Sequence, residues 1–426
     1  MRLTYENCCG IDVHKTFLVA TIVITKNNVP QYQKKRFSTF NKSLREFRQW
    51  LLSNNCKDVC MESTGKYWVP VWNVLEETVN VTIANPKWVS AVKGNKDDEK
   101  DSKWIADLFR MGVVRGSYIP KREIRILREL TRYRYKLTCM RSSEKNRYQN
   151  AFTVCNCNLD AVVSDMFGKS ALDIENYLIN TNPKDFDPNH CAELLRKSLK
   201  KKSVDIIASI EGFQMSVEQR ERVRIIKEHY DDINTRIDRT DDVIENLVSI
   251  NKWEDAISLI QSIPGVDRHS AISIISEIGT DMTQFSSSKR LCCWAGLTPG
   301  NNQSAGKKKT VRITRAGVYL KPALVQAAHA AVKSTTNTYF KNKYERISRR
   351  RGKKRAIIAI ARKILTAIYH MFKTGELFNP CDIYNEETPE KIKSNQKRKA
   401  AKNAIKLLES LGLVSEGYIT LDKLAS

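Results

Sequence analysis

The first hundred residues carry apolar runs in an order that few folds can accommodate. Cys8–Val13 and Phe17–Thr25 are β-branched apolar runs separated only by the short charged turn at His14 and Lys15, and Gln31–Phe40 alternates apolar with polar residues. Runs of this kind are typical of strands, and strands joined by a short turn pair antiparallel. We therefore expect the chain to begin with three antiparallel strands.

Helices and strands alternate after these three. The expected elements are a helix at Asn41–Leu52, a strand at Val59–Met61, a helix at Trp68–Thr78, a strand at Val81–Ala84 and a helix at Asp97–Met111. Parallel strands joined through helices and added to three antiparallel strands form the α/β arrangement of ribonuclease-H-like and RuvC-like domains. In that arrangement the first and fourth strands are neighbours, so the residues that end them lie close together.

Acidic residues stand at the ends of these elements. They are Asp12 near the end of the first strand, Glu62 just past the fourth, and Asp98 and Asp101 near the start of the last helix. Carboxylates gathered at one sheet edge repel each other unless cations bind between them, and they suit two Mg²⁺ ions about 4 Å apart. Each acid alone could instead serve a turn or a helix cap, and Asp97 and Glu99 are rivals on the same helix.

The middle of the chain is expected to be helical. A strongly basic helix is predicted at Arg122–Phe152. Further along, mostly apolar residues follow steps of three and four without a break, at Val223, Ile226, Tyr230, Ile233, Ile237, Thr240, Ile244 and Leu247. This seam predicts a coiled coil, which suits either self-association or a hairpin folded within the chain.

The predicted fold class is α/β followed by all-α. The expected regions are a RuvC-like domain with the basic helix at 1–155, a helical coiled-coil region at 156–252, a helical C-terminal domain at 253–374 and a basic helical tail at 375–426. In the third region, Ile263–Val266 before an apolar helix is typical of a helix-hairpin-helix turn, whose backbone N–H groups bind a phosphate. A plain turn between two core helices is the alternative.

The charge of the chain indicates a polyanionic partner. Lys and Arg outnumber Asp and Glu by 72 to 47, which gives a formal net charge of +25. Basic clusters with tyrosines among them suit RNA or unpaired DNA, and a solvated charged face is the alternative. The residues expected to bind nucleic acid are Lys15, Arg125, Arg128, Arg132, Arg134, Arg141, Lys145, Arg147, Lys307, Lys308, Lys309, Arg312, Arg315, Arg350, Arg351 and Lys354.

The sequence has few features of a membrane or secreted protein. Its longest apolar run, Phe17–Ile24, is far shorter than the roughly 20 residues of a bilayer helix, and its N-terminus has no signal-peptide pattern. The 11 cysteines include no two CxxC motifs, so buried reduced thiols are favoured over zinc or disulfides. We expect a cytoplasmic protein with no membrane partner.

Three acidic segments resemble those of a known family. Gly10–Lys15, Met61–Gly65 and Lys96–Asp101 resemble the DEDD motifs of the IS110/IS1111 family of insertion-sequence transposases, which are bridge-RNA-guided recombinases. This chain has Asp97 and Ser102 where the third motif of the family usually has Thr and Ala. The resemblance implies that the catalytic metal ligands, which would bind Mg²⁺, are Asp12, Glu62, Asp98 and Asp101.

A second signature lies in the C-terminal region. Ala295–Leu324 resembles the second transposase domain of that family, with its Gly-Leu-Thr-Pro motif and a following Ser-Gly element. From composition alone, Ser304 would be expected only to hydrogen-bond a turn. The resemblance implies instead that Ser304 is the catalytic nucleophile, although Ala305 stands between it and Gly306.

Together these features predict a transposase that cleaves and exchanges strands of donor and target DNA. It would use a Mg²⁺-bound acidic site and a covalent phosphoserine. The resemblance implies a guide RNA and a homo-oligomer, dimer or tetramer, associated with the nucleoid of a prokaryotic cell. A hydrolytic RuvC-like nuclease or junction resolvase, with Ser304 structural, is one alternative. An architectural RNA- or DNA-binding protein, in which Asp12→Asn would abolish no reaction, is another.

Overall fold

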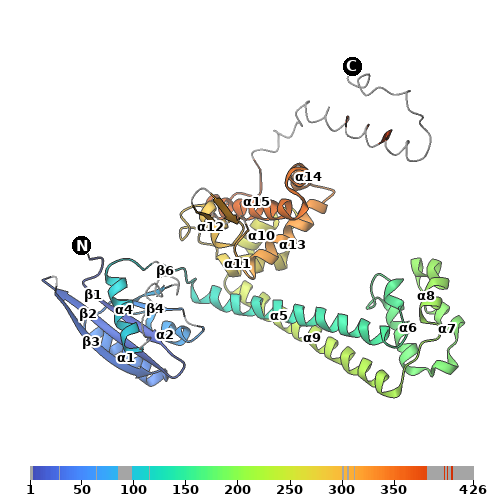
Figure 1. Ribbon diagram of the computed structural model, residues 1–426, viewed down its shortest axis with the longest axis horizontal. Coiled ribbons are helices and arrows are strands. Elements are labelled where there is room, and N and C mark those ends of the chain that lie inside the picture. Colours follow the sequence, from blue (N-terminus) through green and yellow to red (C-terminus); the bar gives the residue numbers. More distant parts are fainter. Residues whose placement is uncertain are drawn as a thin grey trace. The chain divides into compact units, whose positions relative to one another are not determined.

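The structure is a computed structural model that describes residues 3–27, 29–63, 65–84, 98–114, 116–299, 302–304, 307–310 and 312–380, with isolated helical positions at 398, 401, 404 and 405. For residues 98–100, 302–304 and 307–310 it describes the backbone alone. The chain divides into two compact units, Met1–Lys121 and Arg122–Ser426, and Figure 1 shows the helices and strands of each. The finer division into four regions stays a prediction, and most of the predicted tail lies outside the described residues.

A mixed six-stranded sheet forms the first unit. Its strands are β1 (Asn7–Val13), β2 (Phe17–Lys26), β3 (Val29–Ser38), β4 (Asp58–Glu62), β5 (Asn80–Ala84) and β6 (Gly116–Ser117). They lie in the order β3-β2-β1-β4-β5-β6. The first three strands pair antiparallel, β4 pairs parallel with β1, β5 pairs parallel with β4, and β6 pairs antiparallel with β5. The predicted mixed sheet, with its first and fourth strands adjacent, is therefore confirmed.

Helices cover both faces of this sheet. They are α1 (Asn41–Ser53), α2 (Trp68–Leu75) and α4 (Asp98–Arg110). Because successive strand residues point to opposite faces, each strand contributes to two apolar clusters. Ile11 and Met61 pack with α1 and α2 on one face. On the other face, Cys60 packs with Ile105 and Ala106 of α4.

The second unit is helical apart from one small hairpin. Its α-helices are α5 (Arg122–Thr153), α6 (Lys169–Asn180), α7 (Pro188–Glu193), α8 (Ser203–Ile210), α9 (Val217–Ile250), α10 (Glu254–Gln261), α11 (Arg268–Ile278), α12 (Ser288–Trp294), α13 (Leu320–Lys333), α14 (Tyr339–Arg351) and α15 (Lys353–Thr374). Short 3₁₀ helices lie at Leu159–Ala161, Pro183–Asp185 and Lys197–Lys202, and the hairpin strands are β7 (Asn302–Ser304) and β8 (Lys307–Thr310). The predicted helical C-terminal region is therefore confirmed.

The long helices α5 and α9 lie side by side and antiparallel (Figure 1). At their middle, Leu137 of α5 packs between Ile233 and Ile237 of α9 in a small apolar cluster. Both of these α9 residues belong to the predicted seam, and the seam positions Val223 and Ile244 are also buried. The seam therefore packs against a helix of the same chain, as the hairpin alternative predicts.

Two separate hydrophobic cores lie at opposite ends of this helix pair. One end, with Leu127 of α5 and Ile244 of α9, joins the core built from α10 to α15. The other end, with Phe152 of α5 and Val223 of α9, joins the core built around α6 and α8. Because the two cores share no buried residue, each is packed independently of the other.

No described helix is both long enough and apolar enough to cross a membrane. The cysteines in the described part of the chain are all free, and all but Cys139 and Cys293 are buried. Burial raises the pKa of the Cys60 and Cys157 thiols to about 12, so both are protonated near neutral pH and poorly reactive.

Candidate functional site

Asp12 and Glu62 lie at the carboxyl ends of two adjacent parallel strands, Asp12 as the penultimate residue of β1 and Glu62 as the last of β4. The register between β1 and β4 pairs Ile11 with Met61, so the next residue on each strand is one of the two acids. Neighbouring strands lie about 4.8 Å apart, and residues in register on parallel strands point to the same face. Cys60, two residues before Glu62, packs on α4. Both acids therefore belong to the sheet face that α4 covers.

The helix α4 crosses this face antiparallel to β1. Its last residue, Arg110, accepts a hydrogen bond from the Thr4 N–H at 2.8 Å, just before β1 begins. Further back along the helix, a Cβ atom on Gly10 would come within 2.3 Å of the backbone at Ser102 and Ala106. Only glycine permits so close an approach. The N-terminal end of α4 therefore points toward the end of β1.

The first turn of α4 reaches the level of Asp12. Asp12 lies two strand residues beyond the close contact, which is about 6.6 Å along β1. Asp98 lies four helical residues before Ser102, which is about 6 Å along α4. Helix positions 98 and 101 also share faces with the buried Ser102 and Ile105, since residues four apart lie above one another. The backbone thus brings all four predicted acidic positions toward one end of the sheet.

The chemistry of these residues fits a divalent cation. Mg²⁺ prefers carboxylate oxygens, and the four predicted ligands supply no other donor. Among the described side chains, no group of three or more His, Cys, Asp and Glu residues is placed to hold a metal, and the Asp98 side chain is not among them. Two other acids are rivals for the ligand role. Glu99 lies one helical turn before Lys103, on a side of α4 that is exposed at Lys103, and Asp97 lies outside the described residues. The metal site therefore stays a prediction.

Asp12 has a hydrogen-bond partner that the sequence pattern does not predict. The Nε2 atom of His14 lies 2.9 Å from Oδ2 of Asp12. The imidazole ring also stacks on Phe17, with 4.5 Å between ring centroids. Many sequences have a histidine two residues after an acid near the end of a strand, so this spacing alone does not predict a hydrogen bond. The contact is seen only in the folded turn.

Ser304 lies at the end of β7, in a hairpin with β8. The register pairs Ser304 with Lys307, so two residues join the strands. From the sequence alone a loop is expected at this position, whereas the structure has a hairpin. Strands of 3 and 4 residues are too short to show the alternation that predicts a strand. The side chains of Ser304 and Lys307–Lys309 lie outside the description. The nucleophilic role of Ser304 therefore stays a prediction.

Two glycines bring the segments before and after this hairpin together. A Cβ atom on Gly296 would lie 2.6 Å from the Ala316 carbonyl oxygen, and one on Gly317 would lie 2.4 Å from the Ala295 carbonyl oxygen. Both glycines have positive φ angles, 69° and 68°, which other residues rarely adopt. The glycine of the Gly-Leu-Thr-Pro motif is thus required for the crossing of two backbone segments.

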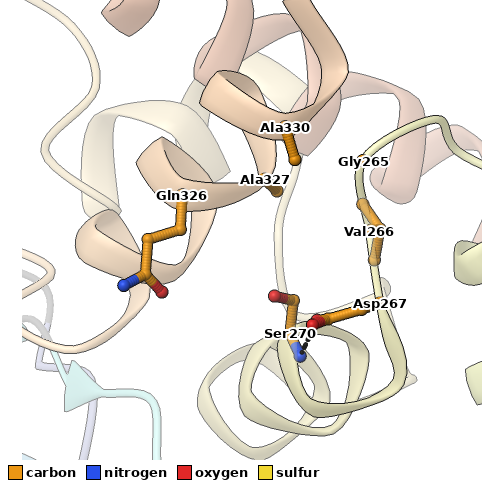
Figure 2. A pocket seen from close by; sticks show the side chains of 7 residues that line it. All are labelled: Gly265, Val266, Asp267, Ser270, Gln326, Ala327 and Ala330. Carbon is orange, nitrogen blue, oxygen red and sulfur yellow. Dashed lines mark hydrogen bonds between the residues drawn. The ribbon is translucent and has the colours of Figure 1, made fainter. Parts of the chain in front are cut away.

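The turn between α10 and α11 also depends on close packing. Gly265 has a φ of 86°, and a Cβ atom there would come within 2.3 Å of the Ala331 backbone nitrogen in α13. Figure 2 shows a shallow pocket beside this turn, between α13 and the start of α11, where Asp267 caps the helix by accepting the Ser270 N–H at 2.8 Å.

The Asp267 cap bears on the phosphate-binding interpretation of this turn. Burial acts to raise the pKa of Asp267, but hydrogen bonds from Ser270 outweigh it and hold the pKa below its ordinary value. An ionised carboxylate therefore occupies the helix end that a phosphate would approach. This favours the plain turn between core helices.

Most of the α5 arginines expected to bind nucleic acid have partners within the protein. Arg132 donates two hydrogen bonds, of 2.7 and 2.8 Å, to the carboxylate of Glu277 in α11. Arg128 donates to two carbonyl oxygens in the last turn of the same helix, at 2.9 and 2.8 Å. Arg134 forms an ion pair with Asp241 of α9. These contacts hold α5 against its neighbours in the unit.

Three more residues on α5 follow the same pattern. Arg141 bonds to Asn234, Lys145 to Asp165, and Arg147 to Glu144. These partners come from several parts of the fold, and their acidic members offset some of the positive charge of α5. The net charge around the helix is therefore lower than the sequence of α5 alone indicates. Nucleic-acid binding by these residues stays a prediction, because their first contacts are structural.

Other predicted basic residues face solvent. The exposed members of the set are Lys15, Arg312, Arg315, Arg350, Arg351 and Lys354. Arg125 is half-buried, and the side chains of Lys307, Lys308 and Lys309 lie outside the description. Among the described residues, the end of α14 and the start of α15 thus present a dense positive cluster, which suits phosphate contact.

Two family models match the chain. One, described as Transposase and built on the DEDD domain of the IS110 type, matches residues 9–156. The other, described as Transposase IS116/IS110/IS902 family, matches residues 257–345, and together the two cover more than half of the 426 residues. The chain is also similar to the transposase for insertion sequence element IS1111A of Coxiella burnetii (strain RSA 493 / Nine Mile phase I), with 28% identity over 158 residues. This match spans 36% of the chain and 43% of that relative, less than half of its length.

Proposed function

The chain belongs to the IS116/IS110/IS902 family of transposases, and from this premise we propose that it is the DNA recombinase of an insertion sequence. One observation in the first unit carries the proposal. Asp12 and Glu62 lie near the ends of adjacent strands on the sheet face under α4, and the first turn of α4 comes to their level. Carboxylates gathered in this way suit the divalent cations that assist cleavage and rejoining of DNA strands.

The proposed metal ligands are Asp12, Glu62, Asp98 and Asp101. Bound between them, Mg²⁺ would neutralise charge on the reacting phosphate and stabilise the leaving oxygen. The sheet holds the first two carboxylates on a rigid surface, whereas α4 brings the other two. Gly10 sets the distance between sheet and helix, so it controls how closely the two pairs of acids approach.

The proposed nucleophile is the hydroxyl of Ser304. Its oxygen attacks a DNA phosphorus atom, an Oγ–P bond forms, and the bond from phosphorus to one deoxyribose oxygen breaks. The proton of Ser304 is passed to the leaving deoxyribose oxygen, which becomes a free hydroxyl. In the second step a hydroxyl of another DNA end attacks the same phosphorus, and Ser304 leaves and regains a proton. No water is consumed, so every broken phosphodiester is replaced.

The proposal includes a guide RNA and an assembly of two or four chains. Exposed lysines and arginines such as Arg350 and Lys354 suit phosphate contacts, which carry no base sequence, and base pairing by the guide RNA would choose the target. The seam of α9 is covered by α5 of the same chain, so an assembly would be held by other surfaces.

A covalent adduct tests this proposal most directly. Purified protein is incubated with end-labelled donor and target DNA, guide RNA and Mg²⁺, then denatured, and labelled DNA is sought on the protein band. The wild type is expected to carry label, and Ser304→Ala none. Ser286→Ala is a matched control, because Ser286 is an exposed serine of the same region. Recombination by Ser304→Ala at the wild-type rate would exclude the serine mechanism.

A hydrolytic RuvC-like nuclease is the second candidate, favoured by the same acidic positions. It would use water as the nucleophile, so cut DNA would accumulate without an adduct and without rejoining. Asp12→Asn abolishes product in both candidates and leaves an architectural nucleic-acid-binding protein unaffected. The pair of variants therefore separates all three functions.

A further inference from the structure

The turn between β1 and β2 is held by hydrogen bonds on several sides. The His14 N–H donates to the Phe17 carbonyl oxygen at 2.9 Å. Thr39, beyond the end of β3, donates its hydroxyl to the Lys15 carbonyl oxygen at 2.9 Å and its N–H to the Thr16 carbonyl oxygen at 3.1 Å. The backbone around His14 is therefore fixed by two neighbouring segments of the first unit.

The imidazole ring of His14 is restrained as well. Its plane lies 28° from that of Phe17, with the ring centroids 4.5 Å apart. The guanidinium of Arg36 lies 3.7 Å from the centroid of the same phenyl ring, which restrains Phe17 in turn. The His14 side chain is 33% exposed, so it is partly covered by its neighbours. Stacking thus limits the directions in which the ring nitrogens can point.

From this geometry we propose that His14 is a positioning residue that orients the Asp12 carboxylate. Nε2 of His14 lies 2.9 Å from Oδ2 of Asp12, whose side chain is only 14% exposed. An ionised carboxylate only accepts hydrogen bonds, so the Nε2–H group is the donor. The bond restricts rotation of the carboxylate about its Cβ–Cγ axis and so sets the direction in which Asp12 meets a cation.

The inference rests on the proposed function, because the cation is the one proposed for the DEDD site. A carboxylate that is already oriented loses less freedom when the cation binds, so the hydrogen bond favours binding. Loss of a partner of this kind typically weakens metal affinity by about 10- to 100-fold. A purely structural role for His14 predicts a change in stability and no change in metal affinity.

The experiment measures Mn²⁺ binding to the full-length protein by isothermal titration calorimetry, without DNA. His14→Ala removes the hydrogen bond and the ring, whereas His14→Gln restores an N–H donor at a similar distance without the ring. His229→Ala is the matched control, since His229 makes a 3.3 Å contact with Glu144 in the second unit. Asp12→Asn reports whether the acidic site binds Mn²⁺ at all. Circular dichroism during heating identifies any variant that fails to fold.

The expected result is weaker Mn²⁺ binding in His14→Ala by about tenfold or more, with most of the affinity regained in His14→Gln and none lost in His229→Ala. The Mg²⁺ concentration that gives half-maximal DNA cleavage should rise in parallel, while the maximal rate changes less.

Three outcomes overturn the inference. If Asp12→Asn weakens Mn²⁺ binding but His14→Ala does not, the role of His14 is lost and the proposed function stands. If Ala and Gln at position 14 are equally weak, the ring and not the hydrogen bond is responsible. If Asp12→Asn binds Mn²⁺ as the wild type does, the acidic site itself fails, and the inference fails with it.

Discussion

Removing the Arg132 guanidinium should loosen the second unit without removing a DNA contact. The Glu277 carboxylate accepts both of its hydrogen bonds from Arg132, at 2.7 and 2.8 Å, and the Glu277 side chain is only 7% exposed. In Arg132→Ala this carboxylate stays in the interior without its guanidinium partner. The contact between α5 and α11 is then destabilised.

The size of the effect follows from the exposure of the two partners. Removing one member of a buried ion pair costs about 3–5 kcal/mol. The Arg132 side chain is 40% exposed, so water reaches the pair and the cost falls to about 2 kcal/mol. At about 1.4 kcal/mol per factor of ten, local opening of α11 should become roughly 30-fold more frequent.

Two assays in parallel test this reasoning. Hydrogen–deuterium exchange should show faster exchange of the α11 amides in Arg132→Ala, with no change in Arg350→Ala. The salt dependence of binding to duplex DNA should keep its slope in Arg132→Ala and lose about 0.9 units in Arg350→Ala for one phosphate contact. Unchanged exchange together with a lower salt slope in Arg132→Ala would refute the argument, because the guanidinium would then contact phosphate.

Three further outcomes are expected. Gly10→Ala should lower the thermal midpoint of the first unit, because its Cβ atom would lie 2.3 Å from the backbone of α4. A midpoint within about 2 °C of the wild type would contradict this close packing. Burial raises the pKa of Glu175 from 4.5 to about 8 against the opposing hydrogen bond from Tyr148, so its contribution to stability is full below pH 4.5 and declines as the pH rises to about 8. Urea midpoints measured across that range should show this decline in the wild type and a flatter profile in Glu175→Gln. Replacing Arg350 and Arg351 together by Ala should weaken binding to all duplex sequences alike, and a change in sequence preference in a competition assay would argue against phosphate contact.

The strand order of the first unit follows from sequence for a physical reason. A strand covered on both faces is apolar at nearly every position, so Cys8–Val13 and Phe17–Thr25 stand out as continuous runs. The short turn that joins these two strands allows only antiparallel pairing between them. By contrast, β6 and the β7–β8 hairpin are too short to carry a period, and the structure alone reveals them.

The partners of the α5 arginines could not be predicted from the local sequence. Glu277 lies 145 residues from Arg132, and Asp241 lies 107 residues from Arg134. A count of acids near the basic helix therefore underestimates the charges that meet it after folding. The strand order places Asp12 and Glu62 on neighbouring strands, so their proximity could be expected from sequence, whereas the contact between His14 and Asp12 depends on the stacking within one turn.

The antiparallel pair of α5 and α9 acts as a spacer between two bodies that share no packing. The 32 residues of α5 span about 48 Å, with one hydrophobic core at each end. Removing seven residues from each helix would shorten the spacer by about 10 Å and return every seam side chain to the same facing side. If the residues came from the middle of each helix, both ends would keep the apolar side chains that they contribute to the two cores. The reach of a protein built in this way can therefore change in heptad steps, without redesign of the parts that it separates.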